Sequence, residues 1–290
     1  PKPVMKKFDG KLLPKDLQDY DLAQINTADA TVMAPQFEFK KHGESGQEIS
    51  SIFPQLARHA DKLAIIRSMH HDLFIHGSAM IMMHSGTRLL GNPSIGAWVV
   101  YGLGCESNDL PAYIAMTDGI FRNGASMYTS GFLPAVYQGT DVRIDGSLIQ
   151  NLDRHENISA TEQRLLLDHI NAWNRQHRKS RPGDSRLDAR IANYELAFRM
   201  QTAAPELIDL AQETKATRAL YGVDEGPSAR FGKMCLMSRR MVERGVRYVQ
   251  LICGGWDAHG DCKGNHEGQA KKIDKPIAGL ITDLQQRGLL

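Results

Sequence analysis

The clearest strand signal in the sequence constrains the fold more than any other feature. Residues 246–252 (Val-Arg-Tyr-Val-Gln-Leu-Ile) are mostly apolar and are bounded by glycines on both sides. Amphipathic helices are predicted on either side of this strand, over residues 228–244 and about 269–287. Helix, strand and helix in this alternation are typical of a parallel sheet with crossover helices. The sequence therefore predicts an α/β fold with a mostly parallel sheet flanked by helices.

Two shorter apolar runs predict further buried strands. They are residues 63–66 (Leu-Ala-Ile-Ile) and residues 112–116 (Ala-Tyr-Ile-Ala-Met), and continuous apolar runs of this length are typical of strands covered on both faces. A helix is predicted over about residues 51–62, before the first run. Asn92-Pro93 predicts the start of another helix, because asparagine caps helices and proline favours the first helical position.

Charged helices between about residues 153 and 225 are predicted to form an α-helical insertion. Ser159 and Glu162 have the spacing of a capping box, in which each side chain bonds the backbone of the other. A second helix is predicted over residues 185–202, and Pro205 is predicted to start a shorter one. We expect residues 1–290 to form a single α/β domain with this insertion.

Composition excludes several classes of protein. The chain has 290 residues and a net charge of +2, which does not indicate a nucleic-acid-binding or membrane-surface protein. Four cysteines are too few for a disulfide scaffold, and no apolar stretch is long enough to span a membrane. The first residues, Pro1-Lys2-Pro3, and the last, Gly288-Leu289-Leu290, are interpreted as truncated ends, so the domain is expected to be incomplete.

The loop after residues 246–252 carries the strongest chemical signal. In an open parallel sheet, ligands bind beyond the carboxyl ends of the strands, where this loop is expected. Residues two apart in extended backbone project to the same side, so Asp257 and His259 can reach one ion. Asp261 and His266 follow closely and are predicted as further ligands or as residues that orient the ligands. Carboxylate and imidazole together suit zinc, manganese or iron better than calcium.

Two other interpretations of this loop remain open. In the first, its aspartates and histidines only satisfy local backbone amides. In the second, two cysteines and two histidines form a structural zinc site, although their spacings fit no standard zinc finger. The four residues of that second set are Cys253, His259, Cys262 and His266.

A second group of histidines follows the predicted strand at residues 63–66. His70 and His76 are predicted to contribute to anion binding or acid–base chemistry. We expect at least one of them to lie near Asp257 and His259. His84 belongs to a methionine-rich helix and is predicted to pack in the core.

Several segments resemble one bacterial family, called domain of unknown function 1501. They include Ile65-Ile66-Arg67-Ser68-Met69-His70, Pro93-Ser94-Ile95-Gly96-Ala97-Trp98 and Gly255-Trp256-Asp257-Ala258-His259-Gly260-Asp261. The other segments are the run from His76-Gly77 through Ser85-Gly86, Ser130 to Gly139, and Tyr194 to Gln201. The resemblance covers essentially the whole chain.

This family is similar to the alkaline-phosphatase and sulfatase superfamily, which implies an α/β sandwich with metal ions at the carboxyl ends of its strands. The resemblance implies a metal-dependent hydrolase acting on a small or polymeric sulfate or phosphate ester. It also implies a periplasmic or exported location, since family members typically start with an export signal. The Cys/Ser-x-Pro-x-Arg motif of true sulfatases is missing from this sequence. The alternative is an exported binding or assembly protein that uses the same fold without catalysis.

Overall fold

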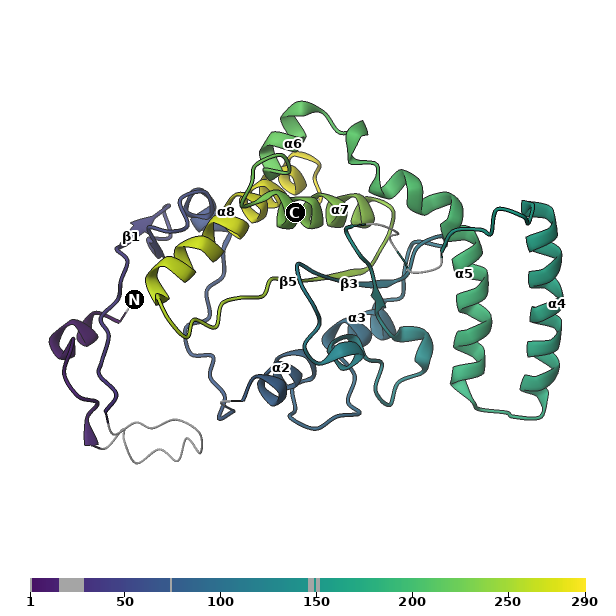
Figure 1. Cartoon of the computed structure of the whole chain (residues 1–290), viewed down its shortest axis with the longest axis horizontal. Helices are drawn as coiled ribbons and strands as arrows, with labels where there is room; N and C mark the ends of the chain where they lie inside the picture. Colours follow the sequence, from purple (N-terminus) through teal and green to yellow (C-terminus); the bar gives the residue numbers. More distant parts are fainter. Residues whose placement is uncertain (1, 16–28, 74, 146–148, 150–151) are drawn as a thin grey trace. The chain divides into compact units, whose positions relative to one another are not determined.

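The computed structural model describes residues 2–15, 29–73, 75–145, 149 and 152–290, and these form a mixed α/β structure (Figure 1). The chain divides into two compact units. The terminal unit comprises Pro1–Phe74 and Gly255–Leu290, and the central unit comprises Ile75–Gly254. A single domain with a helical insertion stays a prediction.

A small parallel sheet forms the middle of the central unit. Its strand order is β4 (Thr140–Asp141), β3 (Tyr113–Thr117) and β5 (Tyr248–Ile252), and β3 pairs in parallel with both neighbours. The strands predicted over residues 112–116 and 246–252 are therefore confirmed, as is their parallel arrangement. Strand β4 was not predicted, because two residues within a glycine- and serine-rich segment carry no periodic signal.

Helices cover both faces of this sheet, as Figure 1 shows, with α7 (Ala229–Glu243) on one side and α3 (Ile95–Leu103) on the other. Strand β3 is almost wholly buried between them. A Cβ atom on Gly96 would lie 2.5 Å from the Tyr113 ring, so only glycine lets α3 approach the sheet so closely. The first helical residue of α3 is Ile95, and Ser94 takes the cap position that had been predicted for Asn92.

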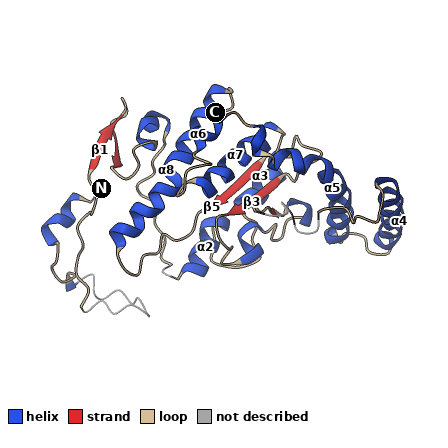
Figure 2. Ribbon diagram, turned by 45° about the horizontal axis from the view of Figure 1, so that its top comes forward, coloured by secondary structure: helices blue, strands red, loops and turns tan. Residues whose placement is uncertain are grey.

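The predicted helical insertion contains two long antiparallel helices, α4 (Ala160–Lys179) and α5 (Ser185–Ile208), visible as a hairpin in Figure 2. The capping box is confirmed, since Ser159 accepts from the Glu162 N–H and Glu162 accepts from the Ser159 N–H. Helix α5 continues through Pro205, so the prediction that this proline starts a new helix is wrong.

The remaining elements of the central unit are short. They are α2 (His76–Ser85), η3 (Gly124–Tyr128), η4 (Ala135–Tyr137), η5 (Leu210–Gln212) and α6 (Lys215–Tyr221).

The terminal unit contains η1 (Pro3–Phe8), an antiparallel hairpin of β1 (Phe39–His42) and β2 (Gln47–Ser50), η2 (Leu56–Lys62) and α8 (Cys262–Gln286). The predicted α-helix over residues 51–62 is instead the shorter 3-10 helix η2. Its first turn is held by Asp274 of α8, whose carboxylate accepts from the N–H groups of Gln55 and Leu56 at 2.9 and 2.8 Å. A distant side chain thus replaces the local serine cap.

The strand predicted at residues 63–66 is wrong. This segment has no strand conformation, and Ile65 and Ile66 are 42% and 69% exposed. Only Leu63 packs inward, against the small core of Ile49 and Ala60. Apolar residues form a strand only where a neighbouring backbone offers a hydrogen-bonding edge, and this segment pairs with none of the described strands. In the part of the chain that the structure describes, no helix is long and apolar enough to cross a membrane.

Candidate functional site

The structure brings Asp257 and His259 into direct contact. The Nε2 atom of His259 lies 2.8 Å from Oδ2 of Asp257, and both side chains are accessible to solvent. Because a carboxylate oxygen can only accept, the imidazole donates from Nε2, and in a neutral ring Nδ1 then keeps its lone pair. The two side chains therefore lie on the same side of the loop, as their spacing predicted.

Asp261 has a structural task that the sequence did not indicate. Helix α8 begins at Cys262, earlier than predicted, and Asp261 is its cap. Its Oδ1 atom accepts from the Gly264 N–H at 3.1 Å, and its backbone takes the left-handed conformation with φ of 40°. A Cβ atom on residue 264 would lie 2.2 Å from the Asp261 carboxylate, so glycine leaves room for this cap. Asp261 thus serves the backbone of α8.

His266 lies in the first turns of α8 rather than in a loop. Its Nδ1 atom is 2.7 Å from the backbone carbonyl of Cys262 and 3.5 Å from the Cys262 thiol. A carbonyl can only accept, so Nδ1 carries a proton and Nε2 is the nitrogen with an available lone pair. The ring also packs edge to face with Trp256, with 5.8 Å between ring centroids. These contacts fix the orientation of His266.

Among the residues that the structure describes, no three His, Cys, Asp or Glu side chains lie close enough together to hold one metal ion. Asp257 and His259 offer a carboxylate and an imidazole, but these two groups are hydrogen-bonded to each other. Asp261 is engaged with α8. The donor set is therefore a pair and not a closed metal cage, and the predicted divalent metal stays a prediction.

The other two histidines predicted for the site belong to different units of the chain. His70 belongs to the terminal unit, where its Nδ1 lies 3.2 Å from the Ser68 carbonyl. His76 is the first residue of α2 in the central unit. Whether His70 or His76 shares a site with Asp257 and His259 is not tested by the geometry of either unit alone, so the shared site stays a prediction. His84 is half-buried, and burial lowers its pKa. None of the described residues of α2 is fully buried, so the predicted position of His84 in the core is wrong.

At the carboxyl edge of the sheet, Asp118 joins the ends of two strands. It follows β3 directly, and its Oδ1 accepts from the Gly254 N–H at 2.9 Å while its Oδ2 accepts from the Cys253 thiol at 3.2 Å. Its backbone carbonyl accepts from the Arg230 guanidinium at 2.9 Å. Asp118 thus fixes the backbone after β5 next to the end of β3.

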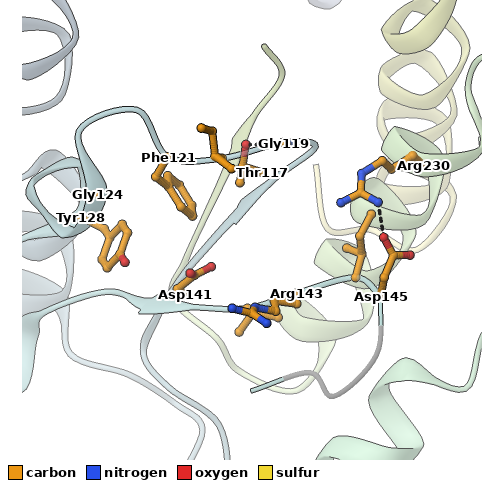
Figure 3. A pocket seen from close by; sticks show the side chains of 12 residues that line it. Thr117, Gly119, Phe121, Gly124, Tyr128, Asp141, Arg143, Asp145 and Arg230 are labelled. Atoms are coloured by element: carbon orange, nitrogen blue, oxygen red, sulfur yellow. Dashed lines mark hydrogen bonds and ion pairs between the residues drawn. The ribbon is translucent and has the colours of Figure 1, made fainter. Parts of the chain in front are cut away.

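Beside Asp118, at the same edge of the sheet, lies an open cavity of about 490 Å³ (Figure 3). Asp141 at the end of β4 and Tyr128 at the end of η3 line one part of it. Burial raises the pKa of Asp141, and the nearby Arg143 opposes this rise. Burial also raises the pKa of Tyr128, and the negative charge of Asp141 adds to the effect. The cavity therefore contains interacting polar groups that are partly shielded from water.

The family model described as "Protein of unknown function (DUF1501)" matches residues 1–290. The chain belongs to this family. No curated protein and no solved structure matches it. The resemblance noted in the sequence is therefore confirmed for the DUF1501 family.

The polar residues at the sheet edge of this DUF1501 protein were not predicted. Asp118 could have been identified, because it lies in the loop that follows a predicted strand, as Asp257 does. Asp141 and Arg143 had no such signal, since β4 could not be recognised. Arg230 lies 85 residues from its partner Asp145, and nothing in the local sequence indicates that pairing.

Proposed function

We propose that this protein is a hydrolase-like α/β domain that acts on an anionic ester, a phosphate or a sulfate, with Asp257 and His259 as its central pair. The observation that supports the proposal is the 2.8 Å contact between His259 Nε2 and Asp257 Oδ2 on an accessible loop. The resemblance to the alkaline-phosphatase and sulfatase superfamily supplies the fold and the class of substrate. An exported location belongs to the same proposal.

The pair can perform acid–base chemistry. Asp257 holds the imidazole in one orientation and one tautomer, which leaves Nδ1 of His259 directed away from the carboxylate. That nitrogen can take a proton from a water molecule that attacks the ester, and it can later return the proton to the leaving oxygen. A positioned acid–base group of this kind contributes about 10²–10⁴-fold to a reaction rate.

A divalent ion, zinc, manganese or iron, is also part of the proposal. Asp257 and His259 would supply two of its ligands. His266 would add a third through Nε2, because its Nδ1 is bonded to the Cys262 carbonyl, or Asp261 would add one through a carboxylate that also accepts from the Gly264 N–H. Such an ion would polarise the ester oxygen when bound.

The alternative function is binding or assembly without catalysis. One observation favours it: α3 carries exposed aromatic residues in edge-to-face contact. Trp98 lies 6.0 Å from Tyr101 and 5.7 Å from Phe132 between ring centroids, and Phe132 is 66% exposed. Exposed aromatic groups are enriched at binding surfaces.

The test is hydrolysis of p-nitrophenyl phosphate and p-nitrophenyl sulfate by the protein, with and without added Zn²⁺ or Mn²⁺. We expect Asp257→Asn and His259→Gln each to lower kcat/KM by about 100-fold or more. His177→Gln is the matched control, because His177 is exposed on α4 in the other unit.

The outcomes separate the roles of the pair. Equal loss of bound metal in both variants supports ligation, whereas retained metal with an altered pH profile supports acid–base action. Turnover that is unchanged in both variants contradicts the proposal. Absence of turnover in the unmodified protein favours the non-catalytic alternative.

A further inference from the structure

The cavity at the carboxyl edge of the central sheet has the size and position of a ligand site. Its volume of about 490 Å³ lies within the range of roughly 300–1,000 Å³ of small-molecule pockets. Thr117 at the end of β3 and Asp141 at the end of β4 both line it, and ligands of open parallel sheets bind at this edge. All the residues that line it belong to the central unit.

The charged groups of the cavity balance one another, and one guanidinium and one carboxylate are directly paired. Arg230 forms an ion pair with Asp145 and donates from Nε to the Asp118 carbonyl. Arg143 interacts electrostatically with Asp141 and lowers the pKa of that carboxyl against the effect of burial. Two guanidinium groups and two carboxylates thus cancel in net charge. A charged ligand that binds Arg230 or Asp145 would have to disrupt their ion pair and leave the other partner less well compensated.

The opposite side of the cavity is aromatic. Phe121 and Tyr128 pack edge to face with 5.1 Å between ring centroids. Figure 3 shows these rings near Asp141, while the Arg230–Asp145 pair lies across the cavity. Such rings provide an apolar surface, and the tyrosine adds a hydroxyl group that can both donate and accept.

We propose that this cavity binds one residue of a neutral sugar. Sugar hydroxyls donate and accept at once, so they can bond a carboxylate and a guanidinium without breaking the ion pair between them. Neighbouring hydroxyls match the two-pronged geometry of arginine and aspartate side chains. The apolar C–H face of the ring would lie against Phe121 and Tyr128. The inference does not depend on the proposed hydrolase function, since it uses none of the residues in the Asp257–His259 loop.

The test is saturation-transfer NMR of the protein with four probes, glucose, galactose, mannose and N-acetylglucosamine, and with inorganic phosphate and glycine as charged comparisons. We expect saturable binding of at least one sugar in preference to both charged probes. Asp145→Asn and Phe121→Ala should each weaken it by about 5-fold or more, the effect of one lost hydrogen bond or packing contact.

Asp224→Asn is the matched control for Asp145→Asn. Asp224 is paired with Arg218, and the side chains of Asp224 and Asp145 are both 61% exposed. Each variant therefore loses one ion pair whose carboxylate is equally exposed. Asp224→Asn should leave sugar binding unchanged. The proposal is overturned if none of the four sugars binds, if phosphate or glycine binds more tightly, or if Asp145→Asn and Phe121→Ala both bind sugar as the unmodified protein does.

Discussion

Replacing Glu213 with glutamine should destabilise the central unit strongly. The carboxylate of Glu213 forms an ion pair with Arg239 at 2.8 Å and accepts from Arg240 at 2.7 Å, and both arginine side chains are at most 6% exposed. Removal of one partner from a buried ion pair costs about 3–5 kcal/mol, because the remaining charge is left uncompensated. Arg239 keeps its bond to Glu243 at 2.6 Å, so we expect a value near the lower end, about 3 kcal/mol.

Urea denaturation followed by circular dichroism measures this change. With a slope of about 1–3 kcal/mol per molar urea, the midpoint should fall by roughly 1–3 M. Glu106→Gln is the control: Glu106 is paired with Arg247 at 2.8 Å but is 74% exposed, so its loss should cost less than about 1 kcal/mol. Equal midpoints for the two variants would refute the argument that burial sets the cost.

The stabilisation by Glu213 should also depend on pH. Burial acts to raise the pKa of Glu213, but hydrogen bonds from Arg240 and Arg239 outweigh it and hold the pKa below its usual range. A lowered pKa in the folded state gives stability that is fully present above the unfolded value of about 4.3 and is lost as the pH falls through the folded value. The unmodified protein and Glu213→Gln should therefore differ less in their free energy of unfolding below about pH 4. If the two proteins differed in free energy of unfolding by the same amount at every pH down to 2.5, Glu213 would not have a lowered pKa in the folded state.

Two local predictions follow from the caps. Ser159→Ala should destabilise the protein by about 1 kcal/mol and speed amide hydrogen exchange in the first turn of α4. The control Thr161→Ala should leave this exchange rate unchanged. Equal exchange rates in the two variants would contradict the capping box. Gly264→Ala should fail to gain the roughly 1 kcal/mol that alanine normally adds to a helix, because Asp261 must give up its cap. Gly268→Ala, which meets no neighbouring atom, should show that gain in thermal melts, and a similar gain at both positions would contradict the role given to Asp261.

The sequence predicted those parts of the fold whose signals are local. The capping box of α4 and the apolar run of β5 depend on residues within a few positions of one another. The strand expected at residues 63–66 failed because strand formation also needs a partner edge. The helix expected over residues 51–62 was replaced by η2, whose cap is Asp274, 219 residues from Gln55. Long-range partners of this kind carry no local pattern.

In the candidate site, too, local spacing was predictive and longer-range structure was not. Spacing alone predicted that Asp257 and His259 face the same side, and they do. Spacing also placed Asp261 and His266 in the same loop, but α8 begins at Cys262 and directs their hydrogen bonds to its own backbone. The cavity beside Asp118 could not be predicted, because it forms where β3, β4 and α7 meet.

The most direct test of the central claim is a long-range ¹H–¹⁵N correlation spectrum of His259, recorded at a pH where the spectrum itself shows a neutral ring. The account predicts a proton on Nε2 and none on Nδ1 in the unmodified protein, since Asp257 accepts from Nε2. Asp257→Asn should shift both nitrogen resonances and mix the two tautomers. Identical His259 resonances in the two proteins would show that Asp257 does not hold the imidazole, and the proposed catalytic pair would not exist.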